Sequence, residues 1–162
     1  MMMKSHAISV LVNDQPGVLQ RVAGLFGRRG FNIESITVGQ SEEAGLSRMI
    51  IVTKGDDKTL EQIEKQLYKL IDVIKVVNLS SRPMVARELA LIKVKAEPAE
   101  RPEIMGVVDT FRAAVVDIGT HSMIVQVVGD TEKIDAMIEL LRPYGIRELS
   151  RTGVTAMIRG NA

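Results

Sequence analysis

Cysteine and tryptophan are missing from this chain of 162 residues, and Phe and Tyr bring the aromatic fraction to only 3%. Without cysteine there are no disulfides, no thiol catalysis and no thiolate metal sites, which fits a reducing cytoplasm. With so few aromatic rings, the chain has no platform for stacking nucleic-acid bases or for binding a sugar ring. The hydrophobic core must therefore come from Val, Ile, Leu and the nine Met residues.

An excess of charge of either sign is also lacking, because 21 basic and 20 acidic residues leave a formal net charge of +1. Such a chain has no strong field to attract a polyanion. No apolar run approaches the roughly 18 residues that span a bilayer, and the apolar stretch before Asn13 is too short for the core of a signal peptide. We therefore expect a cytoplasmic protein with neither a nucleic-acid nor a membrane partner.

The hydrophobic pattern of the first half predicts the element order β-α-β-β-α-β. A β-branched stretch at 6–12 predicts a strand, and an amphipathic helix is expected from Pro16 to Gly30, with the glycine as its C-cap. A strand at 32–40 and its hairpin partner at 46–55 follow, separated by a loop. A second helix then begins after residue 56, and a last strand is expected at 73–80.

The second half repeats this order. Strands are expected at 88–96, 115–119, 122–129 and 148–160, and helices are expected after residue 103 to about 113 and after Asp130, which is a candidate N-cap. The repeat predicts an α+β fold of two tandem ferredoxin-like (βαββαβ) domains, 1–81 and 82–162. Each would be an antiparallel sheet with two helices on one face, and its other face and one edge strand would be free to associate.

The sequence contains no constellation of catalytic groups. His6 lies at the start of a predicted strand and His121 in a distant predicted turn, so each is interpreted as structural or solvated. The adjacent carboxylates at 42–43 and 56–57 are better explained by solvation or helix capping than by acid–base catalysis. There is no nucleophile elbow, Walker loop or HExxH motif. We predict no catalytic residues and no metal site.

The turn "NDQPG" needs only its backbone to bind a ligand. If Pro16 is the first helical residue, the free N–H groups of residues 17–19 point toward whatever lies before the helix. A carboxylate there would meet these donors and the positive end of the helix dipole, and Gly17, without a Cβ, would let it come close. Asp14 and Asn13 would accept hydrogen bonds from an ammonium group. This arrangement suits a free α-amino acid.

Two other interpretations stay open. The turn is equally explained as a capped helix start that binds nothing. The stretch "LFGRRGFNI" contains G-x-x-G between apolar residues, which is similar to the RNA-clamping loop of KH domains. That loop joins two helices, however, whereas here a β-rich run follows Gly30.

The long segment "NDQPGVLQRVAGLFGRRGFNIESITVG", together with "LSRMIIV" and "LEQIEKQLYKLIDVIKV", closely resembles the small regulatory subunit of acetolactate synthase (acetohydroxyacid synthase). The first half is similar to its ACT domain. The resemblance continues through "ARELALIKV", "DTFRAAVVDIG" and "ELSRTGVTAMIRG", and so covers the chain from about Ser5 to Arg159.

The resemblance implies a non-catalytic subunit that activates a catalytic (large) subunit and makes it sensitive to valine or another branched-chain amino acid. The cofactors thiamine diphosphate, Mg and FAD would belong to that partner, and none to this chain. In the family, ACT domains pair side by side in a homodimer and the effector lies at their interface. Carried onto this chain, one subunit contributes Asn13, Asp14, Gln15, Pro16, Gly17, Val18 and Leu19, and the other contributes Phe31, Asn32 and Ile33.

In this arrangement Asn32 would offer an amide to one end of the ligand, and Ile33 with Val18 or Leu19 would form an apolar wall. We assign Asp14 to the ammonium end as a hypothesis, because a carboxylate there would repel the ligand's own carboxylate. The alternative within binding proteins is a stand-alone ACT-type sensor of another enzyme or regulator.

Overall fold

The computed structural model describes residues 4–160, which divide into two compact units. The described part of unit 1 comprises residues 4–85 and 154–160, and unit 2 comprises Ala86–Gly153. The chain therefore passes between the units twice, and its last strand returns to the unit in which the chain begins. The sequence placed a single boundary between residues 81 and 82.

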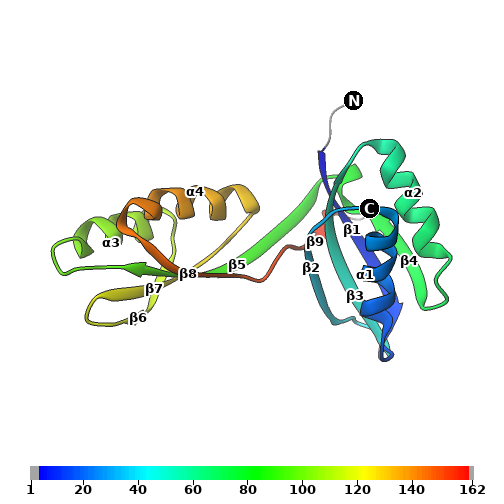
Figure 1. The fold of residues 1–162 in the computed structure, drawn as a ribbon, viewed down its shortest axis with the longest axis horizontal. Helices are drawn as coiled ribbons and strands as arrows, with labels where there is room; N and C mark the ends of the chain where they lie inside the picture. The colour runs from blue at the N-terminus through cyan, green and yellow to red at the C-terminus, as the bar shows by residue number, and fades with distance from the viewer. Residues whose placement is uncertain (1–3, 161–162) are drawn as a thin grey trace. The chain divides into compact units, whose positions relative to one another are not determined.

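Unit 1 has the predicted βαββαβ order (Figure 1). Its elements are β1 (Lys4–Asn13), α1 (Val18–Arg29), β2 (Ile33–Gln40), β3 (Leu46–Gly55), α2 (Asp57–Tyr68) and β4 (Val73–Asn78), followed by a short 3-10 helix, η1 (Leu79–Ser81). The strands form an antiparallel sheet in the order β2-β3-β1-β4, which leaves β2 and β4 at the edges.

The core of unit 1 lies between α1, α2 and one face of this sheet. Alternate residues of β1, namely Ile8, Val10 and Val12, are buried there against Phe26 and Ile63 of the helices. The period of two along the strand and the spacing of three and four along the helices place these side chains on facing surfaces. Helix α1 ends at Gly30 in the left-handed conformation, which confirms its predicted role as C-cap.

Unit 2 repeats the fold with β5 (Met84–Lys95), which begins in unit 1, and β8 (Ile146–Arg151) as its outer strand. Between them lie α3 (Arg101–Thr110), β6 (Ala114–Ile118), β7 (Ser122–Gly129), α4 (Thr131–Leu141) and a short 3-10 helix, η2 (Arg142–Tyr144). The sheet order β6-β7-β5-β8 is the same as in unit 1, and Asp130 caps α4 as predicted. Figure 1 shows α3 and α4 on the same side of this sheet. The predicted α+β fold with two ferredoxin-like repeats is confirmed.

The C-terminal strand differs from the prediction. The expected strand at 148–160 is two strands, β8 in unit 2 and β9 (Thr155–Ile158) in unit 1, because the chain turns at Gly153 with a φ of +86°. Strand β9 pairs with the beginning of β5. It lies on the sheet face of unit 1 that faces away from the helices, where the Thr37 hydroxyl donates to the Val154 carbonyl at 3.0 Å. The face that we expected to be open is therefore partly covered by the chain itself.

Candidate effector site

The turn between β1 and α1 has the geometry of a type II β-turn. Gly17 has φ and ψ of 84° and −4°, and the Val18 N–H donates to the Gln15 carbonyl at 3.4 Å. Proline at the second position and glycine at the third are the residues that a type II turn favours, because the third position requires a positive φ. The Pro-Gly pair thus shapes the turn that precedes the helix.

The prediction that Pro16 is the first helical residue is wrong. Gly17 is the N-cap, and α1 begins at Val18. The Arg21 N–H donates to the Gly17 carbonyl at 3.0 Å, and no side chain caps the helix. Among residues 4–160, the amides of Gly17, Leu19 and Gln20 have no backbone acceptor, so of the three donors expected to be free only that of Val18 is engaged.

Contacts from two other loops hold the turn in place. The Asn13 N–H donates to the Asp72 carbonyl, and the Asp14 N–H donates to the Gly45 carbonyl, both at 2.9 Å. Asp72 also forms an ion pair with Arg21, whose Nε and Nη2 atoms lie 2.8 and 2.7 Å from its Oδ2. The backbone of the turn is thus fixed before any ligand binds.

Arg21 adds positive charge to this helix start. Its Nη1 atom lies 2.9 Å from the position that a Cβ on Gly17 would occupy. The Asp72 side chain is only 12% exposed, whereas that of Arg21 is 48% exposed. A buried carboxylate therefore orients a half-exposed guanidinium beside the turn. Reasoning from the sequence missed this pair, because only the fold brings residues 21 and 72 together.

The side chains around the turn differ in what they present to solvent. Val18 is buried in the core, whereas Leu19 remains 46% exposed. Of the two apolar residues considered for a ligand wall, only Leu19 offers its side chain. Asp14 is exposed, and together with Glu43 it lines a cavity of about 210 Å³ beside the loop that ends at Gly45.

The second group of predicted residues lies where α1 passes into β2. Phe31 packs edge-on against Phe26, with ring centroids 6.0 Å apart, and its N–H donates to the Phe26 carbonyl at 2.9 Å. Asn32 has an exposed side chain, and its carbonyl accepts a hydrogen bond from the Thr53 hydroxyl. Ile33 is half-buried and begins the edge strand.

One chain does not bring the two groups together, because they lie at opposite ends of α1. A helix of 12 residues is about 18 Å long. The sheet gives the same result, since Asn13 pairs with Leu46 and Ile33 pairs with Thr53 on β3. Seven residues of strand separate those partners by about 24 Å. A site that uses both groups requires a second chain.

The remaining candidates for chemistry have structural roles. In "LFGRRGFNI", Gly27 lies within α1 and Gly30 leads into a strand, so this segment is not the inter-helical loop of a KH domain. The imidazole of His6 is buried, 3.1 Å from the Gly55 carbonyl. His121 is exposed, and its Nδ1 lies 3.0 Å from Glu97, where its hydrogen bond lowers the pKa of that carboxyl.

Residues 4–160 contain no group of three or more His, Cys, Asp or Glu side chains placed to hold a metal ion. In the same stretch of chain, none of the helices has the length and apolar character that crossing a bilayer requires.

Comparison with known proteins accounts for both units. Residues 8–75 match the AHAS small subunit-like ACT domain, and residues 87–160 match the small subunit of acetolactate synthase. A probable acetolactate synthase small subunit from Methanothermobacter thermautotrophicus is 58% identical over 158 residues, which is 97% of this chain and 94% of that protein. The chain belongs to the acetolactate synthase small-subunit family.

Other members of the small-subunit family agree along the whole length. The Bacillus subtilis acetolactate synthase small subunit is 51% identical over 94% of this chain and 90% of its own. The crystal structure of the small subunit from Thermotoga maritima superposes with a TM-score of 0.90 at 48% identity and covers 98% of this chain and 99% of that one. Unit 1 is therefore an ACT domain, and unit 2 is the C-terminal domain of an acetolactate synthase small subunit.

Proposed function

We propose that this chain activates the catalytic subunit of acetolactate synthase and confers feedback inhibition by valine, or by another branched-chain amino acid, bound where two ACT domains meet. The chain itself is non-catalytic in this proposal. Thiamine diphosphate, Mg and FAD would be held by the catalytic partner. Membership of the small-subunit family supports the partner, and the geometry of the ACT domain supports the effector site.

The observation that supports an effector site between two chains is the separation of residues 13–19 from residues 31–33 along the sheet. Strand β2 is an edge strand, free to pair with a second chain. If two copies of β2 pair antiparallel about a two-fold axis, the Ile33 end of one lies beside the Gln40 end of the other. Gln40 pairs with Ser47, next to the Leu46–Asn13 pair. Such a dimer would place Asn32 and Ile33 of one copy at the end of the joint sheet that carries the Pro-Gly turn of its partner.

The chemistry of the assembled site fits an amino acid with an apolar side chain. The amides of Leu19 and Gln20, the helix dipole and Arg21 would bind its carboxylate. Asp14 would bind its ammonium group, and Leu19 and Ile33 would contact its side chain. Binding at about 0.1 mM requires only about 5.5 kcal/mol, which is modest for a ligand of this size.

Reconstitution with a catalytic subunit tests the proposal. Acetolactate formation is measured with the catalytic subunit alone, with this chain added, and with valine added to both. We expect this chain to raise the rate and valine to lower it again. No stimulation and no inhibition would refute the function.

Asp14→Ala tests the ammonium contact separately. Removing a hydrogen bond to a charged group costs about 1.5 to 3 kcal/mol, so we expect valine affinity measured by calorimetry to fall by at least about tenfold. An unchanged affinity would remove Asp14 from the site and leave the rest of the proposal standing. Binding of valine without any effect on a catalytic subunit would favour the stand-alone sensor.

A further inference from the structure

The segment Val154–Ile158, which we call the strap, is short and lies on the outer face of the ACT sheet. Strand β9 has four residues, and among the strands of residues 4–160 it pairs with β5 alone. Val154 and Ala156 are the two strap residues whose side chains are buried, and Met157 is 68% exposed. Because small buried side chains contribute little apolar area, the strap is held far less firmly than the core strands.

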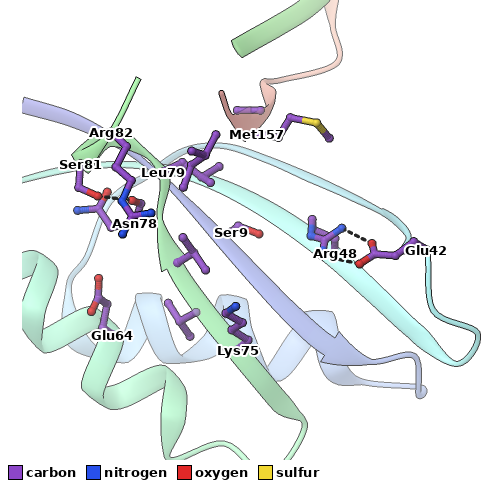
Figure 2. A pocket seen from close by; sticks show the side chains of 14 residues that line it. Ser9, Glu42, Arg48, Glu64, Lys75, Asn78, Leu79, Ser81, Arg82 and Met157 are labelled. Atoms are coloured by element: carbon purple, nitrogen blue, oxygen red, sulfur yellow. Dashed lines mark hydrogen bonds and ion pairs between the residues drawn. The ribbon is translucent and has the colours of Figure 1, made fainter. Parts of the chain in front are cut away.

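Cavities on the sheet face next to the strap leave it without close packing there. Ala156 and Met157 line a cavity of about 710 Å³ with Ser9 and Lys75, and a second one of about 300 Å³ with Gly39. Figure 2 shows Ser9 and Lys75 among the residues around the larger cavity, together with Met157 from the strap. A strand with open space beside it can move away from the face of the ACT sheet without disturbing the core on the other side of that sheet.

Hydrogen bonds anchor the chain on either side of the strap. Before it, Arg151 is bound to Glu88 by two hydrogen bonds of 2.6 and 3.0 Å within unit 2. After it, the Arg159 N–H donates to the Pro83 carbonyl at 2.9 Å. Gly153, at a φ of +86°, provides a turn between Arg151 and the strap.

A single strand connects the strap to the proposed effector site. Thr37, whose hydroxyl donates to Val154, lies on β2 four residues after Ile33. The strand is at the sheet edge, and its pairing with β3 is irregular between Ile33 and Ser35. A ligand that orders the beginning of β2 therefore acts on the strand that holds the strap.

We infer that the strap docks on and leaves the outer face of the ACT sheet, that bound effector favours the docked form, and that this equilibrium carries the feedback signal. The inference rests on the proposed effector site and adds the moving element. Coupling between two sites requires an element with two states that both sites bias. The strap is such an element. Strand β2 of the effector site holds it through Thr37, and unit 2 ends at Gly153, immediately before it.

Single cysteines report docking directly, because the natural chain has none. Ala156→Cys places a thiol at a position that is 7% exposed, and Met157→Cys places one at the neighbouring position that is 68% exposed. The labelling rate of each full-length variant by a thiol reagent is measured with and without saturating valine. We expect valine to slow labelling of Cys at 156 at least threefold and to leave the rate at 157 within twofold. Equal rates at 156 with and without valine would overturn the inference.

Thr37→Val tests the link to feedback without substituting any residue of the strap. It removes the hydroxyl that holds Val154 and keeps the size of the side chain. We expect the variant to bind valine within threefold of the natural chain, yet to lose at least half of the inhibition in the reconstituted enzyme at saturating valine. The matched control is Thr155→Val, because the Thr155 side chain is exposed and its hydroxyl has no hydrogen bond within residues 4–160.

The outcomes separate this inference from the proposed function. If the natural chain neither binds valine nor confers inhibition, the proposed function fails. If the natural chain is inhibited and Thr37→Val is inhibited equally, the proposed function stands and the strap is only structural. Loss of both valine binding and inhibition in Thr37→Val would also overturn the inference about the strap, since the substitution would then act on the effector site itself.

Discussion

At the scale of single residues, Gly17 meets two requirements, because its φ of 84° is strained for any other residue and its missing side chain leaves room for the Arg21 guanidinium. Gly17→Asp would add a negative charge within reach of the Arg21 guanidinium and would repel a carboxylate. We expect this variant to lose valine inhibition in the reconstituted enzyme while still activating the catalytic subunit. Valine binding is measured by calorimetry and activation by acetolactate formation.

Gly17→Ala is the matched control, because it introduces the same backbone strain without the charge. Both variants should lose about 1 kcal/mol of unfolding free energy. Only the aspartate should abolish valine binding, whereas the alanine should weaken it by less than about tenfold. Equal loss of binding in both would show that strain, and not charge, is responsible. Loss of activation with retained valine binding would contradict the placement of the site.

The same turn shows what residue patterns predict well and what they miss. Gly30 and Asp130 were identified as caps because capping depends on a few neighbouring residues. Pro16 fits the first turn of a helix and the second position of a type II turn equally well, since both require the same φ. The choice depends on the following glycine and on Asp72 and Gly45, which hold the turn and lie far away in the sequence.

At the scale of secondary-structure elements, α2 depends on its N-cap. The side chain of Asp56 accepts a hydrogen bond from the Thr59 N–H at 2.8 Å, which lowers the pKa of Asp56 below its ordinary value of 3.8. A carboxyl whose pKa is lower in the folded state stabilises the fold above its unfolded pKa, and this contribution disappears as the pH falls through the folded pKa. Acid should therefore weaken the cap.

We expect the stability advantage of the natural chain over Asp56→Asn to be constant above about pH 5 and to shrink as the pH falls through about 4 and below. Asparagine keeps the cap but does not titrate. Urea unfolding followed by circular dichroism measures the difference at each pH. Asp57→Asn, one residue further on and exposed, controls for the loss of one negative charge. An advantage over Asp56→Asn that is independent of pH would contradict the prediction.

The strands that lead into and out of unit 2 are joined by an ion pair. Arg151 of β8 binds Glu88 of β5 with two hydrogen bonds and Asp135 of α4 with a third, and Glu88 is only 5% exposed. These carboxylates raise the pKa of Arg151, so it remains charged at any ordinary pH. Removing one partner of a buried pair leaves the other charge without compensation.

Arg151→Met should therefore cost about 3 kcal/mol of unfolding free energy. Circular dichroism in urea is the appropriate measurement, because the chain contains no tryptophan for fluorescence. Arg142→Met is the matched control, since its ion pair with Glu139 is 61% and 67% exposed. An exposed pair is worth at most about 1 kcal/mol. If the two variants lost the same stability, the burial of Glu88 would not determine the strength of its ion pair.

At the scale of the whole molecule, element order could be predicted from hydrophobic periodicity, because each half repeats it independently. The return of the C-terminal strand to unit 1 could not. The segment from Ile146 to Ile158 keeps a strand-like pattern, and only the positive φ at Gly153 divides it. Val18 shows the same limit, since its place on the apolar stripe did not reveal whether it faces the core or a ligand.

The site that two chains complete makes a prediction that no single variant can test. Gly17→Asp disables the turn, and Asn32→Ala disables the beginning of β2, so each homodimer should bind valine poorly. A mixed dimer has one site with both defects and one site with none, because the intact turn of one copy faces the intact strand of the other. Random exchange makes half of the dimers mixed, so roughly a quarter of all sites should recover.

The experiment co-expresses the two full-length variants, purifies the mixture and titrates it with valine by calorimetry. Recovery of roughly a quarter of the sites at the affinity of the natural chain is expected. The control is a homodimer in which every chain carries both substitutions, and it should recover no valine sites. If both groups belonged to one chain's own site, the mixture would bind no better than its components, and the 18 Å that α1 sets between the groups would have to be bridged within one subunit.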